Sequence, residues 1–195
     1  MKVIGITGSV GSGKTTVAKI LKEYWNAHLI ITDDVAKELM TRGNISYRFI
    51  VEFFGDGILD SNQEIDRKKL GEIVFADKSA LIKLNSFTHP YVREFVLEEI
   101  KRVKTLNEAS FIVVETALLI EAGYQEFCDE VWYVTAKDST KRQRLKVSRG
   151  YSDEKIDSIL QNQLSDDEYR KYCKVVLPND GDIAAIKNEI QNLLV

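Results

Sequence analysis

The sequence is poor in the residues that usually cross-link or stiffen a chain, with 2 cysteines and 2 prolines among 195 residues. Cys128 and Cys173 lie far apart and lack the Cys-x-x-Cys spacing of zinc sites and redox pairs, which predicts two reduced or buried thiols. No apolar run approaches the roughly 18 residues of a membrane span, and the apolar N-terminal stretch is too short for a secretory signal peptide. We therefore expect a soluble protein of the cytoplasm.

The sequence also lacks an excess of positive charge, because 27 Lys and Arg residues are balanced by 30 Asp and Glu residues. Nucleic-acid-binding domains usually carry a broad basic face, so the net charge of −3 argues against a nucleic acid partner. The apolar share of 44% and the charged share of 29% are ordinary for a globular chain, and 195 residues fit one compact domain. We expect a monomer or a weak homo-oligomer.

Short apolar runs of the kind seen in buried parallel strands alternate with amphipathic helical segments. The predicted strands are residues 2–7, 29–31, 111–114, 131–134 and 174–177. This alternation predicts an α/β fold, a mainly parallel five-stranded sheet sandwiched by helices.

Residues 45–104 contain no convincing strand, and this stretch predicts a helical subdomain inserted into the α/β fold. Its predicted helices cover residues 45–54, 67–75, 80–87 and 90–104. Pro90 would occupy the first turn of the last of these helices, where a proline is well tolerated.

Residues 8–15 read GSVGSGKT and match the phosphate-binding pattern G-x-x-x-x-G-K-[ST] at every fixed position, between the first strand and the first helix. Glycines let such a loop wrap a phosphate and point backbone N–H groups at it from a helix N-terminus. Lys14 would reach the β- and γ-phosphates of a nucleotide, and the Thr15 hydroxyl would bind Mg²⁺. We predict an ATP site made by Gly11, Ser12, Gly13, Lys14, Thr15 and Thr16.

A phosphate loop alone does not separate switch GTPases, ATP-driven motors and small-molecule kinases. The GTPases need Asp-x-x-Gly, and no Asp in this sequence has Gly three residues later. Residues 135–138 read TAKD, which does not match the guanine-reading pattern [NT]-K-x-D. Motors are usually longer, so a small-molecule kinase is the favoured class.

Three further features carry candidate chemistry, each with a plainer alternative. Glu115 ends a predicted buried strand and could hold a Mg²⁺-bound water, or it is a carboxylate in a surface turn. Residues 137–149 hold six basic residues and one acid, which suits a mobile lid over a phosphoryl group or simply a solvated helix face. Asn179 in a Pro-Asn-Asp-Gly turn could line an adenine pocket or only shape the turn.

Over roughly residues 3–181 the sequence resembles the dephospho-CoA kinase family, which catalyses the last step of coenzyme A synthesis. The matching motifs are the glycine-rich loop at 8–16, the element at 31–33, His89-Pro90-Tyr91-Val92-Arg93, and the strand and Leu-Leu-x-Glu at 115–121. An arginine-rich lid with Arg142, Arg144 and Arg149, and a glutamine after it, Gln163, also match. The family's Asp-Ala-Asp is here Ile31-Thr32-Asp33, its proline is Ala117, and Ser158 stands near the position of a late arginine.

The resemblance assigns roles to residues whose chemistry alone is ambiguous. It implies that Asp33 is the general base toward the acceptor hydroxyl rather than only a helix cap, with Lys14 and Arg144 as further catalytic residues. The residues expected to bind the acceptor are Asp33, His89, Arg93 and Glu121. Arg149 and Asn179 would join the phosphate loop in binding ATP, and Thr15 and Glu115 would hold Mg²⁺. For His89 and Arg93, the alternative is a helix start with one surface arginine.

The resemblance implies a single P-loop kinase domain over residues 1–195, with an acceptor-binding insertion at about 45–104 and a lid at about 137–165. The expected reaction transfers the γ-phosphoryl group of ATP, with Mg²⁺, to the ribose 3′-hydroxyl of dephospho-CoA. A nucleoside or nucleotide kinase is the alternative enzyme, and a nucleotide-gated regulatory protein is the alternative of another class.

Overall fold

The sheet of the protein has five strands, all parallel, in the computed structural model, which describes residues 1–194. The strands are β1 (Lys2–Thr7), β2 (Ala27–Ile31), β3 (Phe111–Glu115), β4 (Glu130–Thr135) and β5 (Val175–Pro178). They lie in the order β2-β3-β1-β4-β5, and each neighbouring pair is parallel. The predicted parallel sheet is confirmed, with small shifts at the strand ends.

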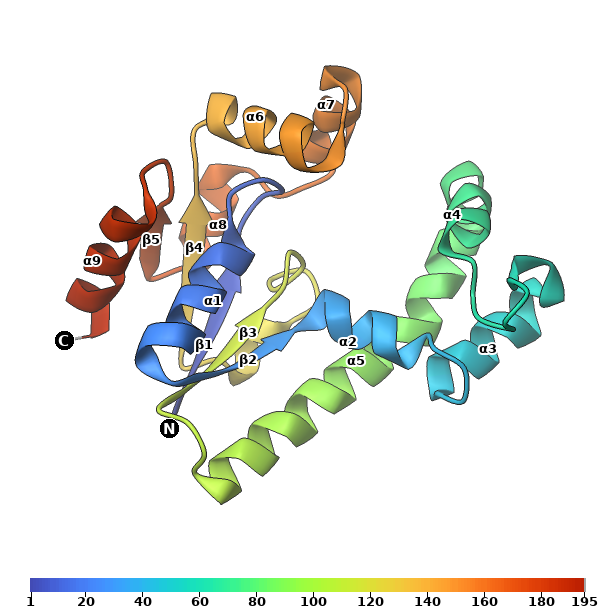
Figure 1. Cartoon of the computed structure of the whole chain (residues 1–195), viewed down its shortest axis with the longest axis horizontal. Helices are drawn as coiled ribbons and strands as arrows, with labels where there is room; N and C mark the ends of the chain where they lie inside the picture. The colour runs from blue at the N-terminus through green and yellow to red at the C-terminus, as the bar shows by residue number, and fades with distance from the viewer. Residues whose placement is uncertain (195) are drawn as a thin grey trace. The chain divides into compact units, whose positions relative to one another are not determined.

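Helices connect the strands and account for most of the remaining chain (Figure 1). They are α1 (Lys14–Trp25), α2 (Thr32–Leu39), α3 (Ile45–Phe54), α4 (Arg67–Ala76), α5 (Lys78–Leu106), α6 (Asp138–Arg149), α7 (Asp153–Gln161), α8 (Asp166–Tyr172) and α9 (Ile183–Leu194), with short 3-10 helices at Asp56–Ile58 and Tyr124–Phe127. Within residues 1–194, none of these helices combines the length and the hydropathy that crossing a membrane requires.

The contacts divide the chain into two compact units. The sheet unit comprises Met1–Ile31 and the chain from Arg102 onward, and the helical unit comprises Thr32–Lys101. The helical unit thus begins earlier than the 45–104 range expected from the sequence, because α2 is part of it. The second boundary falls within α5.

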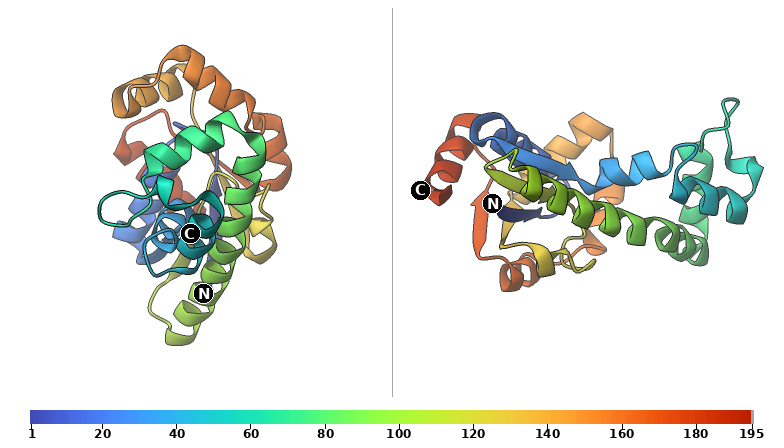
Figure 2. Two further views of the ribbon diagram at one scale, coloured as in Figure 1. Left: turned by 90° about the vertical axis from the view of Figure 1, so that its right-hand side faces the viewer. Right: turned by 90° about the horizontal axis from the view of Figure 1, so that it is seen from below.

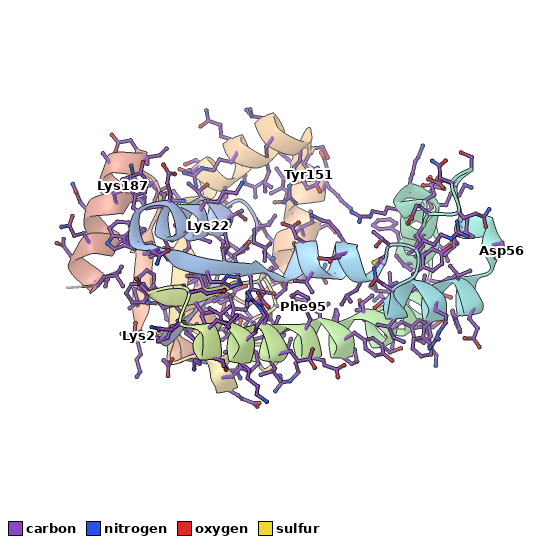
Figure 3. The ribbon with its side chains drawn as sticks, turned by 60° about the horizontal axis from the view of Figure 1, so that its bottom comes forward. Lys2, Lys22, Asp56, Phe95, Tyr151 and Lys187 are labelled. Atoms are coloured by element: carbon purple, nitrogen blue, oxygen red, sulfur yellow. The ribbon has the colours of Figure 1, made fainter. Side chains whose placement is uncertain are left out.

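One core of the sheet unit lies between a face of the sheet and two helices, α1 and α9. Leu21 from α1 and Ile190 from α9 are fully buried against sheet residues such as Ile4 and Trp132. Burial of one such side chain contributes about 1.5–3 kcal/mol to folding. At the surface of the same face, the Lys187 ammonium (Figure 3) lies 3.4 Å from the centre of the Tyr24 ring and links the two helices. This packing fixes the first turn of α1, which carries the phosphate loop.

The two cysteines belong to the sheet unit and are both free thiols. Burial raises the pKa of Cys128 to about 12 and the pKa of Cys173 to about 11. Both thiols are therefore protonated at neutral pH and poor nucleophiles, which confirms the structural interpretation of these residues.

The helical unit has its own small core, formed by α3, α4, the turn between them and the first half of α5 (Figure 2). Ile50, Ile58 and Leu70 are buried at its centre. The Asp66 carboxylate caps α4 by accepting hydrogen bonds from the N–H groups of Lys68 and Lys69.

The sequence prediction of two helices around Pro90 was wrong, because α5 runs unbroken from Lys78 to Leu106 with Pro90 in its interior. An interior proline removes one backbone donor and crowds the carbonyl four residues earlier, here that of Ser86. The helix persists because Phe87 and Tyr91, on either side of Pro90, both stack on Phe49 of α3, with ring centres 6.0 and 5.9 Å apart. Tertiary packing thus overrides the local signal.

We expect Pro90→Ala to raise the free energy of unfolding by about 1–2 kcal/mol, since it restores a helical N–H at a cost in unfolded-chain entropy. Urea denaturation of the two proteins measures the difference. Glu94→Ala, at an exposed position one turn further along, should change stability by less than about 0.5 kcal/mol. A loss of stability in Pro90→Ala would show that the proline is required for packing.

Candidate active site

The phosphate loop connects β1 to α1 and depends on glycine for its backbone and for space. Gly8, Gly11 and Gly13 have positive φ values of 148°, 79° and 92°. A Cβ on Gly13 would lie 2.1 Å from Nδ2 of Asn179, and a Cβ on Gly11 would lie 2.9 Å from the carbonyl oxygen of Lys141. Segments from late in the chain therefore contact the loop backbone directly, which no larger residue would allow.

Charged and amide side chains hold the carbonyl groups of the loop. The Lys14 ammonium donates to the carbonyl oxygens of Gly8 at 2.8 Å and Ser9 at 3.2 Å. Arg144 from α6 donates to the carbonyl of Ser12 at 3.1 Å and, at 3.4 Å, to that of Gly11. Lys14 and Arg144, both predicted as catalytic, thus lie at the loop.

Asn179 braces the loop from the turn after β5. Its side-chain amide donates to the carbonyl of Ser12 at 2.8 Å, and its own carbonyl accepts from Arg144 at 2.8 Å. The side chain is buried. Asn179 also lines a cavity of about 300 Å³, together with Gly13, Thr16, Ile20, Arg144, Gly181, Asp182, Ile183 and Ile186. A mixed polar and apolar cavity of this size beside a phosphate loop suits the base of a nucleotide.

Two hydroxyl groups of the loop are buried and have no hydrogen-bond partner among the described residues. They are Oγ of Ser9 and Oγ of Ser12, on residues that are 5% and 0% exposed. Buried polar groups are normally satisfied, so unsatisfied donors in a glycine loop at a helix N-terminus fit a phosphate ligand.

Thr15 and Glu115 meet at the carboxyl ends of the central strands. The Thr15 hydroxyl donates to Oε2 of Glu115 at 3.1 Å, and Glu115 is buried at the end of β3. Mg²⁺ prefers hard oxygen ligands and takes few of them from protein, completing its shell with water and phosphate oxygens. A hydroxyl and a carboxylate at this place fit that ion. Residues 1–194 contain no cluster of three or more His, Cys, Asp or Glu side chains that could hold a metal ion.

Ile31, which stands in place of the family's first aspartate, ends β2 and pairs in register with Glu115 on β3. Because isoleucine replaces the aspartate at the end of β2, Glu115 is the acidic residue in the paired strands β2 and β3.

The predicted lid residues separate into different roles in the structure. Arg142 pairs with Asp138, Asp153 and Asp157, which joins α6 to α7. Arg149 lies over the ring of Tyr151, with its guanidinium carbon 5.8 Å from the ring centre, at the turn labelled in Figure 3. Within residues 1–194 the structure places no contact between Arg149 and the phosphate loop, so its role in ATP binding stays a prediction.

Asp33 belongs to the helical unit and lies in the first turn of α2, two residues beyond the end of β2. The residue is exposed, and within residues 1–194 its carboxylate has no hydrogen bond or ion pair. The neighbouring Asp34 is engaged with Lys37, whose ammonium lies 2.6 Å from Oδ1 of Asp34. Of these two carboxylates, Asp33 is therefore the one available to a substrate.

His89 and Arg93 lie four residues apart on α5, also in the helical unit, and so share one helix face. Partial burial lowers the pKa of His89, which favours its neutral imidazole. Glu121 lies in the sheet unit, exposed in the turn after β3, and its charge adds to the effect of burial in raising the pKa of Tyr169. The acceptor roles of these three residues stay predictions.

Sequence reasoning assigned no role to Gln163, although the residue matches the family pattern. Its Oε1 accepts a hydrogen bond of 2.9 Å from the backbone N–H of Val10, in the middle of the phosphate loop. Gln163 lies between α7 and α8, far from Val10 in sequence, so no local signal predicts this contact.

Comparison with known proteins agrees with this site. The chain matches the dephospho-CoA kinase family over residues 2–185. It is 34% identical to the dephospho-CoA kinase of Carboxydothermus hydrogenoformans over 194 residues, covering 100% of this chain and 93% of that protein. The solved structure of TT1252 from Thermus thermophilus superposes with a TM-score of 0.82 at 28% identity, over 99% of this chain and 96% of that chain. Dephospho-CoA kinase from Campylobacter jejuni superposes with a TM-score of 0.73 at 27% identity, over 100% of this chain and 96% of that chain. With its P-loop kinase fold, the chain belongs to the dephospho-CoA kinase family.

Proposed function

We propose that this protein transfers the γ-phosphoryl group of ATP to the ribose 3′-hydroxyl of dephospho-CoA, giving coenzyme A and ADP. The observation that carries the proposal is the phosphate loop. Its backbone carbonyls accept hydrogen bonds from Lys14, Arg144 and Asn179. The buried hydroxyls of Ser9 and Ser12 have no hydrogen-bond partner within residues 1–194. Membership of the family supplies the choice of acceptor.

On the nucleotide side, the loop's N–H groups and the N-terminus of α1 would bind the phosphates electrostatically. The Lys14 ammonium is close enough to the loop to move from the carbonyls of Gly8 and Ser9 to the β- and γ-phosphates. Arg144 lies beside the same loop and would neutralise charge that develops on the transferred group. Asn179 and its cavity would receive the adenine.

Thr15 and Glu115 would hold Mg²⁺, Thr15 through its hydroxyl and Glu115 through its carboxylate or a bound water. When bound, the ion would neutralise negative charge on the phosphates of the nucleotide.

On the acceptor side, Asp33 would orient the 3′-hydroxyl and accept its proton as the new O–P bond forms. Arg93 would pair with acceptor phosphate groups, since a guanidinium binds them in a bidentate manner. His89 and Glu121 would also contact the acceptor, with residues 45–104 as an acceptor-binding insertion and residues 137–165 as a lid. The proposal also includes a cytoplasmic location and a monomer or weak homo-oligomer that acts without nucleic acid.

The reaction is tested by measuring ATP consumption with Mg²⁺ and dephospho-CoA, beside AMP, CMP, uridine and pantothenate as alternative acceptors. We expect turnover with dephospho-CoA and a product heavier by one phosphate on the ribose. Turnover with a nucleotide or nucleoside instead would keep the fold and discard the proposed acceptor. ATP binding without turnover on any acceptor would favour a regulatory protein.

We expect Asp33→Asn to lower kcat by at least about 100-fold while the melting temperature stays unchanged, because the amide can still accept a hydrogen bond but cannot take the proton. Steady-state kinetics with dephospho-CoA measure this loss. Asp34→Asn is the matched control on the same helix turn, and its kcat should stay within about twofold, since its exposed pair with Lys37 contributes little. Near-normal kcat in Asp33→Asn would remove Asp33 as the base.

We expect Glu115→Gln to raise the Mg²⁺ concentration for half-maximal activity by about tenfold, since a neutral amide is a weaker partner for a hard cation. Activity is titrated with Mg²⁺ at fixed ATP. Glu23→Gln, an exposed substitution on α1, removes the same charge away from the loop and should leave the titration unchanged. Overlapping Mg²⁺ curves for wild type and Glu115→Gln would exclude Glu115 from the metal site.

A further inference from the structure

The peptide group between Ser9 and Val10 is held from both sides. Because a trans peptide is planar, its C=O and its N–H point in opposite directions. The Ser9 carbonyl accepts from the Lys14 ammonium at 3.2 Å and from the N–H of Ser12 at 3.2 Å. On the opposite edge, the Val10 N–H donates to Oε1 of Gln163 at 2.9 Å. Gln163 and Lys14 thus lie on opposite edges of the same peptide plane.

Rotation of this peptide would turn the Ser9 carbonyl away from the Lys14 ammonium. The bond from Ser12 N–H resists that rotation from the carbonyl edge. When Lys14 moves to the nucleotide phosphates, its own hold on the carbonyl weakens. Gln163 supplies the bond on the N–H edge, and its partner is the backbone of Val10, so this bond does not depend on where the lysine ammonium points.

The side chain of Gln163 can act as a brace because its own backbone is fixed. The next helix, α8, begins with a capping box in which Ser165 and Glu168 exchange hydrogen bonds. The Tyr133 hydroxyl donates to Oδ1 of Asp166 at 2.5 Å, which ties the start of α8 to β4. Burial and this bond raise the pKa of Tyr133 to about 12, so the hydroxyl stays protonated and donates.

The sheet connects Tyr133 back to the start of the phosphate loop. Tyr133 pairs in register with Thr7, the last residue of β1 before the phosphate loop. The path from Thr7 through Tyr133, Asp166 and Gln163 therefore returns to Val10, three residues further along the loop. The links in this path are one strand pairing, two hydrogen bonds and the short stretch of chain from Asp166 back to Gln163, all within the sheet unit.

From this arrangement we infer that Gln163 is a positioning residue for Lys14, which it acts on through the Ser9–Val10 peptide. The inference rests on the proposed function only in requiring ATP at the phosphate loop, and not on the identity of the acceptor. Removing the acceptor oxygen of Gln163 would let the peptide rotate and leave the ammonium less well placed for the phosphates.

The test compares Gln163→Leu, which removes the acceptor at similar volume, with Gln163→Glu, which keeps an acceptor oxygen. In the protein without nucleotide, amide hydrogen exchange of Val10, followed by NMR, should speed up in Gln163→Leu and stay slow in Gln163→Glu. The Kd for MgATP, measured without acceptor by calorimetry, should rise about tenfold in Gln163→Leu, as expected for one lost net hydrogen bond. It should stay within about threefold in Gln163→Glu at about 0.2 M salt, which screens the added charge.

A double-mutant cycle with Lys14→Met separates positioning of the lysine from a general effect on the loop. In the Lys14→Met background, Gln163→Leu should change the Kd for MgATP by less than about twofold. An equal tenfold effect in both backgrounds would overturn the inference, because Gln163 would then act without Lys14. Unchanged Val10 exchange or unchanged Kd in Gln163→Leu alone would also overturn it.

Gln161→Leu is the matched control, since it places the same substitution on an exposed residue at the end of α7. It should leave Val10 exchange and the Kd for MgATP as in wild type. An equal loss of ATP affinity in Gln161→Leu would show that leucine at this connection disturbs the fold generally, and would overturn a specific role for Gln163. Because both measurements omit dephospho-CoA, failure of the inference and failure of the proposed acceptor are distinguishable.

Discussion

The phosphate loop is governed by a constraint of the peptide group, whose N–H and C=O are fixed in opposite directions. A loop that turns successive N–H groups toward a phosphate must find donors elsewhere for its carbonyl groups. An unsatisfied buried carbonyl would cost about 1–3 kcal/mol, so a few such groups would exceed much of the stability of an ordinary domain. Here Lys14 supplies donors for the first carbonyls of the loop, and Arg144 and Asn179 supply them for the later ones.

This constraint explains why segments from the end of the chain contact a motif near its beginning. Asn179 follows β5, and Arg144 lies on α6, so the packing of the sheet unit brings both to the loop. Asn179 and Arg144 leave no room for a side chain at Gly13, and the backbone of Lys141 on α6 leaves none at Gly11. In Figure 1, α6 lies beyond the carboxyl ends of β1 and β4, where open parallel sheets gather their ligands. The glycines of the motif therefore make room for the contacts from α6 and Asn179 as well as for a phosphate.

The features that the sequence predicts well are those with a local pattern. The parallel sheet follows from short apolar runs, and the phosphate loop follows from fixed spacing between strand and helix. The prediction at Pro90 was wrong because proline often marks a helix start, but here the stacking of Phe87 and Tyr91 on Phe49 keeps α5 continuous. The contact of Gln163 with Val10 could not be predicted, because it depends on how three elements pack and leaves no trace in local spacing. The resemblance to the family already favoured Asp33 over Asp34 as the base, and the structure adds that Asp34 pairs with Lys37, which local spacing did not indicate.

The arrangement of α6 and α7 limits how the proposed lid could move. Arg142 is shared among three aspartates, so one ordered side chain serves several ion pairs that would each be weak alone at the surface. The two helices would then move as a pair, with Gly150 in a left-handed conformation at their joint. This segment is already attached to the phosphate loop, through Arg144 within α6 and through Gln163 just after α7. A closing motion that carries Arg149 toward a nucleotide must therefore either pivot about these two contacts or break one of them. Since both contacts hold the loop itself, binding of phosphate and movement of the pair would be mechanically coupled.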